Sequence, residues 1–128
     1  MVNEPPKIKS LIWIGSSRRD LKIFSRSEVK DVVGYALYQA QVGQKAPSAK
    51  PLRGFGGAGV LEIVEDHQGD TYRAVYTVSF SNLVYVLHAF QKKSKKGIAT
   101  PKSDLDLINR RLQAAEQDYK NAAVGERK

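Results

Sequence analysis

Three strand-like runs joined by very short turns limit most strongly what this chain can fold into. They span residues 60–65, 71–80 and 83–90, and they are rich in β-branched and aromatic side chains. Their connections are only His67-Gln68-Gly69-Asp70 and Ser81-Asn82. Short connections join antiparallel neighbours, whereas a parallel pair needs a crossover of about a dozen residues or more. The middle of the chain therefore predicts an antiparallel meander.

Before the meander, the sequence predicts one strand and two helices. Residues 8–14 have strand character and stop at a glycine, after which Ser16 or Ser17 begins a short helix that reaches about residue 24. A second helix follows, because Ser25 and Glu28 have the spacing of a capping box. Its apolar positions recur at helical spacing and are Val29, Val32, Val33, Ala36, Leu37 and Ala40. Residues 43–59 are rich in glycine and proline and predict a loop.

After the meander, the sequence predicts a charged loop over residues 91–97 and then a last helix. Thr100 offers a cap for this helix, and Pro101 suits its first turn. An apolar stripe along the helix consists of Leu105, Ile108, Leu112, Ala115 and Tyr119.

This order of elements predicts an α+β fold, with a single curved antiparallel sheet and helices packed on one face. The other face is then expected to stay at least partly open. A chain of 128 residues is too short for two ordinary domains, so we expect one domain over residues 1–128 with an ordered core of about residues 7–120.

The composition excludes several classes of function. The chain has no cysteine, which removes thiol chemistry, and its two histidines, His67 and His88, form no local metal motif. We therefore expect neither a metal site nor a cofactor. No apolar stretch approaches the roughly 18 residues of a membrane span, and residues 1–10 do not resemble a secretory signal. These features predict a soluble protein of the cytoplasm.

Positive charge is concentrated in the middle of the chain. The whole sequence has 21 Lys and Arg against 13 Asp and Glu, which gives a net charge of +8. Much of the excess lies in residues 45–102, including Lys50, Arg53 and the run Lys92, Lys93, Lys95 and Lys96. A lysine run is more often a solvated loop than a site. Its coincidence with other cations around an open sheet favours a surface that binds phosphates.

Two side chains of the predicted strands have both a structural and a functional interpretation. Alternation puts Arg73 on one face with Val75 and Thr77, opposite the core residues expected for its strand, either as an ion-pair partner of Glu62 or as a phosphate ligand on the open face. His88 alternates with Val84 and Val86, so it either fills a sheet face or lines a site. Nearby aromatic residues suited to stacking on bases or to the core are Tyr72, Phe90 and Phe55.

Four stretches of the sequence together resemble the RelE/HigB superfamily, and more narrowly its phage-derived branch of HigB-like toxins. They are Lys50-Pro51-Leu52-Arg53-Gly54, Val60-Leu61-Glu62, Tyr72-Arg73-Ala74-Val75-Tyr76 and Val86-Leu87-His88-Ala89-Phe90-Gln91-Lys92-Lys93. The resemblance covers roughly residues 7–120. It implies the toxin of a type II toxin–antitoxin pair, a small basic endoribonuclease that cleaves mRNA on the ribosome. The implied partner is a helix-turn-helix antitoxin of the HigA type.

The resemblance also implies a metal-free mechanism in which the ribose 2′-hydroxyl attacks the adjacent phosphate. Such a reaction needs a base, an acid and cations near the phosphate. Carried over by position, Arg73 stabilises the phosphate, Lys92 and Lys93 form the basic pair that closes the last strand, and His88 acts as base or acid. The remaining basic positions are expected to bind RNA and are Lys50, Arg53, Lys95 and Lys96.

One departure from the family keeps two other functions open. Many relatives have an arginine two places after the strand glutamate, whereas this chain has Val64 there. The loss of one cation is compatible with a non-catalytic ParE-like toxin that targets gyrase. It is also compatible with a degenerate phage-derived protein that only binds RNA or an antitoxin.

Overall fold

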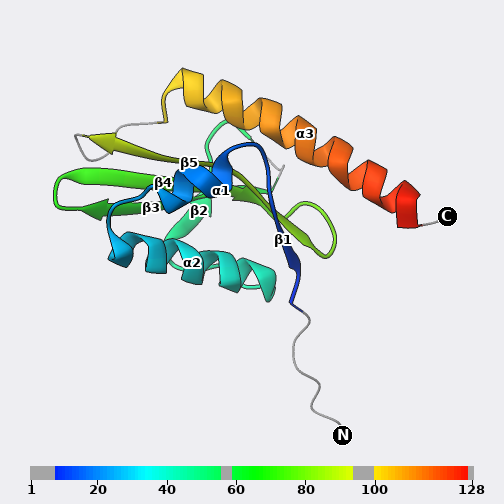
Figure 1. The fold of residues 1–128 in the computed structure, drawn as a ribbon, viewed down its shortest axis with the longest axis horizontal. Coiled ribbons are helices and arrows are strands. Elements are labelled where there is room, and N and C mark those ends of the chain that lie inside the picture. The colour runs from blue at the N-terminus through cyan, green and yellow to red at the C-terminus, as the bar shows by residue number, and fades with distance from the viewer. Residues whose placement is uncertain (1–7, 56–58, 94–99, 127–128) are drawn as a thin grey trace, which may run out of the picture.

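The structure is a computed structural model that describes residues 8–55, 59–93 and 100–126. Its elements in chain order are β1 (Ser10–Trp13), α1 (Ser17–Lys22), α2 (Ser27–Gln41), β2 (Ala49–Pro51), β3 (Val60–His67), β4 (Asp70–Thr77), β5 (Leu83–Lys93) and α3 (Lys102–Glu126). Figure 1 shows the sheet between two long helices, with α2 on one side and α3 on the other. No helix in the described part of the chain is both long and apolar enough to cross a membrane.

The strands form one sheet in the order β1-β5-β4-β3-β2. The predicted meander is confirmed, since β3, β4 and β5 pair as antiparallel neighbours. The α+β class is confirmed too, but the sheet is mixed rather than purely antiparallel, because β1 pairs with β5 in parallel. The long intervening chain lets β5 return in the same direction as β1, as a parallel pair requires.

Helices cover both faces of the sheet, so the prediction of helices on one face is wrong in this respect. Toward α2, the buried residues Tyr72, Ala74 and Tyr76 of β4 pack in one apolar cluster. Toward α3, Val75 of β4 packs in a second cluster with Ile108. The meander strands have apolar side chains on both faces, and the apolar stripe of α3 covers the second one.

The strands differ in extent from the prediction: β1 is shorter than residues 8–14, β3 reaches His67 rather than residue 65, and β4 ends at Thr77 rather than residue 80. The short edge strand β2 lies within residues 43–59, where a loop is expected, and it pairs with β3 from Ala49 to Pro51. Strand β5 continues to Lys93 instead of ending near residue 90, since Lys92 and Lys93 pair with the start of β4. The rest of the expected charged loop, residues 94–97, lies outside the described residues.

The predicted helices are present, but their starts differ from the capping predictions. Helix α2 begins at Ser27 with Arg26 as its N-cap and no side-chain hydrogen bond there, so the Ser25–Glu28 capping box is not formed. Helix α3 begins at Lys102, just after Pro101. The Thr100 hydroxyl instead lies 3.1 Å from the Arg73 guanidinium. Because the Thr100 hydroxyl takes part in hydrogen bonds with distant side chains, it does not cap the start of the helix.

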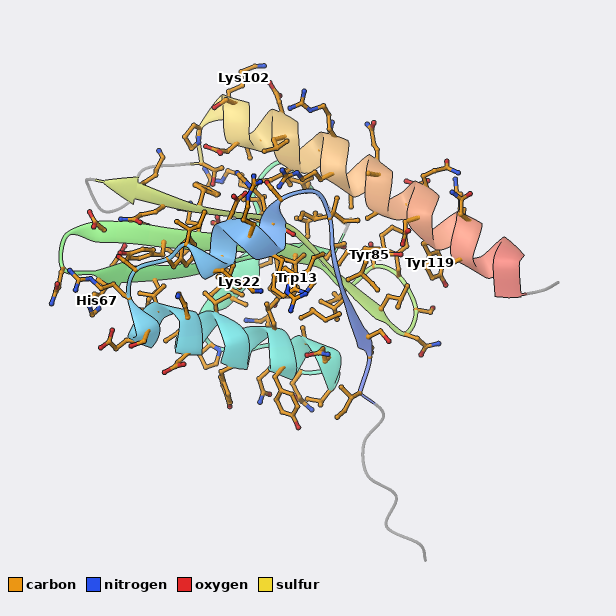
Figure 2. All side chains as sticks on the ribbon, in the orientation of Figure 1. Trp13, Lys22, His67, Tyr85, Lys102 and Tyr119 are labelled. Carbon is orange, nitrogen blue, oxygen red and sulfur yellow. The ribbon has the colours of Figure 1, made fainter. Side chains whose placement is uncertain are left out.

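Two buried tyrosines differ in what their hydroxyls contact. Tyr85 donates a hydrogen bond of 2.8 Å to Asp118 of α3. Its ring contacts Phe80, which also contacts Tyr119, and Figure 2 shows Tyr85 beside Tyr119. The Tyr76 hydroxyl is buried and has no hydrogen-bond partner among the described residues. Burial raises the pKa of Tyr76 to about 12, and burial together with Asp118 raises the pKa of Tyr85.

We expect Tyr76→Phe to leave the free energy of unfolding at pH 7 unchanged or to raise it by up to about 1 kcal/mol, because it removes a buried hydroxyl without a partner. Tyr85→Phe is the matched control and is expected to lower that free energy by about 1–3 kcal/mol, since it breaks a hydrogen bond to a carboxylate. Urea denaturation measures both changes. A clear loss of stability in Tyr76→Phe would contradict this account of the Tyr76 site.

Alkaline pH provides a second test of Tyr76. An unfolded tyrosine ionises near pH 10, whereas folded Tyr76 holds its proton to about pH 12. Its contribution to stability is therefore fully present below pH 10 and is lost as the pH rises from 10 to about 12. Tyr76→Phe should reduce the steepness of that loss by up to about 1.4 kcal/mol per pH unit. If the free energy of unfolding fell identically with pH in the variant and in wild type, Tyr76 would not be responsible for the alkaline loss of stability.

Candidate functional site

A bulge in β5 decides which face His88 occupies. Val75 of β4 pairs with His88, but the next residue, Tyr76, pairs with Val86, so Leu87 is an extra residue in β5. Val84 and Val86 pack in the cluster on the α2 side, whereas His88 contacts Asp104 of α3. The prediction that His88 alternates with Val84 and Val86 is therefore wrong, because the bulge interrupts the two-residue period.

The register brings the polar residues of the meander together on the face that α3 covers. Cross-strand partners share a face, and successive residues on that face lie about 6.5–7 Å apart along a strand. Three neighbouring rows result, namely Lys50–Glu62–Val75–His88, Val64–Arg73–Phe90 and Asp66–Thr71–Lys92. Four of the predicted site residues, Lys50, Arg73, His88 and Lys92, therefore lie in three adjacent rows of one sheet face.

The centre of these rows is a buried ion pair. The Arg73 guanidinium lies 3.1 Å from a Glu62 carboxylate oxygen, and the Thr100 hydroxyl bridges both side chains. Arg73 and Glu62 are each only 6% exposed. Burial of two charges requires close pairing and further hydrogen bonds, which Thr100 helps to provide. The ion-pair interpretation of Arg73 is confirmed, and the sheet face around it is covered rather than open.

His88 is held by a second carboxylate and by an aromatic ring. Its Nε2 lies 2.8 Å from Asp104 Oδ1, and its ring stacks on Phe90 with 4.7 Å between centroids. An ionised carboxylate only accepts hydrogen bonds, so Nε2 is the donor to Asp104, and in the neutral form of the ring Nδ1 has a free electron pair. Nδ1 is buried without a hydrogen-bond partner among the described residues. This arrangement gives His88 a fixed ring orientation and one nitrogen able to take a proton.

The other predicted cations lie at the rim of this buried centre or outside the described part. Lys50 and Arg53 are exposed, and Lys92 is partly buried at the end of β5. The backbone of Lys93 belongs to β5, but its side chain lies outside what the structure describes, as do Lys95 and Lys96. Of the aromatic candidates, Phe90 stacks on His88, whereas Tyr72 packs against Phe24 in the core on the α2 side.

Sequence reasoning missed two contacts of this centre, one made by α3 and one by the segment just before it. Thr100 and Asp104 contact Arg73 and His88 respectively, although each is distant from its partner in the sequence. No local pattern reveals such contacts. The second histidine, His67, lies at the tip of the β3–β4 hairpin (Figure 2). Within the described ranges, no three His, Asp or Glu side chains gather so that they could hold a metal ion.

Comparisons with known proteins match this chain to one family model and to one solved structure. The family model "Phage derived protein Gp49-like (DUF891)" matches residues 19–113. Among solved structures, a chain of the toxin–antitoxin complex RelBE2 from Mycobacterium tuberculosis is 17% identical with a TM-score of 0.43, and the match covers 72% of this chain and 100% of that one. No curated protein matches the sequence.

The buried ion pair generates a stability prediction. We expect Arg73→Ala to lower the free energy of unfolding by about 3–5 kcal/mol, because it leaves the Glu62 carboxylate buried without its cation. The double variant Glu62→Leu with Arg73→Met removes both charges and should recover most of that loss. Denaturation of the two variants beside wild type measures the difference. Equal destabilisation of the single and double variants would contradict the account.

Proposed function

Because the chain belongs to the Gp49-like family of phage-derived proteins, the RelE/HigB-like toxin family that its sequence resembles, we propose that it is the toxin of a type II toxin–antitoxin pair and cleaves mRNA. Its partner on this proposal is a helix-turn-helix antitoxin of the HigA type, and it acts in the cytoplasm, where ribosomes translate messages. The observation that carries the nuclease part is the grouping of Lys50, Arg73, His88 and Lys92 on one sheet face.

The residues of this face suit transesterification of RNA. The ribose 2′-hydroxyl gives its proton to a base and its oxygen attacks phosphorus, while the bond from phosphorus to the 5′-oxygen breaks and that oxygen takes up a proton from an acid, which leaves a 2′,3′-cyclic phosphate and a 5′-hydroxyl. Arg73 supplies positive charge for the phosphate oxygens as negative charge develops on them. His88 is suited to proton transfer, because Asp104 fixes its ring and Nδ1 retains an electron pair. Lys50, Arg53 and Lys92 then hold the flanking phosphates.

Burial of the central groups favours a role for the ribosome. Arg73 and His88 are each 6% exposed, so a phosphate reaches them only after neighbouring side chains move. A phosphate must also compete with Glu62 for the Arg73 guanidinium. A partner that orients the message could supply the free energy needed to separate Arg73 from Glu62 and to move the side chains that cover His88. We therefore propose that cleavage needs the ribosome and that free RNA is a poor substrate.

A second candidate is a protein of the same fold that does not cleave RNA. The observation that favours it is that both buried candidates are already paired with carboxylates, Arg73 with Glu62 and His88 with Asp104. Val64 adds to this, because it pairs with Arg73 across the strands, where many relatives provide a further cation. Such a protein would either inhibit gyrase, as ParE-like toxins do, or only bind an antitoxin or RNA.

Expression of the chain without an antitoxin tests the proposal. We expect growth arrest together with new message 5′-ends inside coding regions, and we expect Lys50→Glu with Arg53→Glu to weaken both. Lys22→Glu with Lys30→Glu is the control, since it changes the net charge equally at exposed positions outside the three rows. Arrest with intact messages would overturn the nuclease proposal in favour of another toxin target. Absence of arrest would favour a binding protein.

Position 64 provides a gain-of-function prediction. Val64 is partly exposed beside Arg73, so an arginine there adds a second cation near the phosphate. We expect Val64→Arg to raise the rate of message cleavage by about tenfold, the effect of one charge-assisted contact of about 1.4 kcal/mol. Val64→Met is the uncharged control and should cleave at the wild-type rate. Equal rates for both variants would show that Val64 is not what limits catalysis.

A further inference from the structure

The bulge in β5 leaves a backbone carbonyl beyond the end of its neighbouring strand. Strand β1 pairs with β5 only as far as Val86, and the Val86 carbonyl accepts hydrogen bonds from the Ile14 amide and the Ser17 hydroxyl. The next carbonyl, that of the bulged Leu87, lies past this ladder. A buried carbonyl needs a hydrogen-bond donor, and a bulge removes the donor that a neighbouring strand regularly provides.

Arg111 of α3 supplies that donor. Its Nη1 donates a hydrogen bond of 2.9 Å to the Leu87 carbonyl. Its Nη2 donates one of 2.9 Å to the Ser16 hydroxyl oxygen, and the Ser16 hydroxyl in turn donates to Asp20 at 2.6 Å. Arg111 therefore connects α3, the bulge and the turn before α1. Only a planar fork with several donors reaches two separate acceptors in this way, which a lysine ammonium on a flexible stem does not reproduce.

The turn before α1 is shaped to receive this guanidinium. Gly15 has a φ of +58°, and a Cβ built there would lie 2.9 Å from Arg111 Nε. Any other residue at position 15 would therefore be strained in its backbone and would also displace the Arg111 side chain. Burial lowers the pKa of Arg111, while nearby Asp20 opposes that shift and favours the charged form.

Arg111 and Asp104 contact consecutive residues of β5 from the same helix. They are seven residues apart, about two helical turns, so they lie on one side of α3. Asp104 contacts the His88 ring, and Arg111 contacts the carbonyl of Leu87, the residue before His88 in the chain. Helix α3 thus holds both the side chain of His88 and the bulge that turns this side chain toward α3.

We propose that Arg111 is a positioning residue for His88. By holding the Leu87 carbonyl it maintains the bulged register of β5, and this register puts the His88 ring beside Asp104 with Nε2 toward the carboxylate. The consequence for RNA cleavage rests on the proposed function, but the positioning itself does not. Without Arg111, β5 loses the contact that fixes the bulge, and His88 loses its defined orientation while the apolar contacts of the sheet remain.

NMR of the imidazole nitrogens tests the positioning directly. The protein has two histidines, and His67 at the hairpin tip serves as an internal reference. We expect wild type to show a single His88 tautomer with the proton on Nε2 and contacts to Asp104. In Arg111→Met and in Arg111→Lys, the His88 signals should change to averaged tautomers without those contacts, while the His67 signals stay unchanged. Wild-type His88 signals in both variants would overturn the proposal.

Two further variants guard against a trivial loss of folding. Arg110→Met changes the exposed neighbour on α3 and should leave the His88 signals unchanged. Ser16→Ala removes the second acceptor of Arg111 together with the hydrogen bond to Asp20, keeps Arg111 itself, and should shift the His88 signals in the same direction by a smaller amount. If Arg111→Met unfolds, Ser16→Ala decides the matter, because an unchanged His88 spectrum there would contradict the proposal.

Kinetics on programmed ribosomes separates this proposal from the proposed function. We expect Arg111→Met to lower kcat by about tenfold or more with little change in KM, because misplacement of a reacting group affects the chemical step. A wild-type protein that cuts no message would overturn the nuclease proposal, and the NMR result would still decide the role of Arg111. An unchanged kcat alongside active wild type would overturn the link from positioning to cleavage.

Discussion

Strands β4 and β5 are covered by helices on both faces, and this two-sided burial is the constraint on which the rest of the structure depends. A charged group that is buried on these strands needs a partner inside the protein. Arg73 pairs with Glu62, His88 with Asp104, and Tyr85 with Asp118. Two of these three carboxylates belong to α3, so the helix that covers the second sheet face also satisfies the polar groups beneath it.

The same constraint affects how the proposed chemistry would work. A buried guanidinium and a buried imidazole are more effective near a phosphate than exposed ones, because the surrounding dielectric is low. Their carboxylate partners, however, reduce the positive charge available to RNA until substrate binding disturbs them. The exposed cations Lys50 and Arg53 are suited to the earlier step of capturing the message. On the proposal, capture and catalysis therefore depend on different residues, the first exposed and the second buried.

The sequence predicted the elements well and their tertiary contacts poorly. Short turns and apolar periodicity are local features, so the meander and the helices α2 and α3 were predictable. The face covered by α3 was not, since β4 has apolar residues on both sides and alternation does not say which side a distant helix covers. The bulge at Leu87 leaves no trace in the hydrophobic pattern. It reversed the expected face of His88 and so concealed its partner Asp104. No local spacing reveals the contact of Thr100 with Arg73 or that of Arg111 with the Leu87 carbonyl.

The chemistry of the cleaved ends tests the central proposal most directly. Ribosomes programmed with a defined message would be treated with the purified protein, and the fragments would be analysed at both new ends. Attack by the 2′-hydroxyl predicts an upstream 2′,3′-cyclic phosphate and a downstream 5′-hydroxyl, and a 2′-deoxy nucleotide at the cut site should abolish that cleavage. Fragments with a 5′-phosphate, or unchanged cleavage of the 2′-deoxy message, would contradict the proposed mechanism.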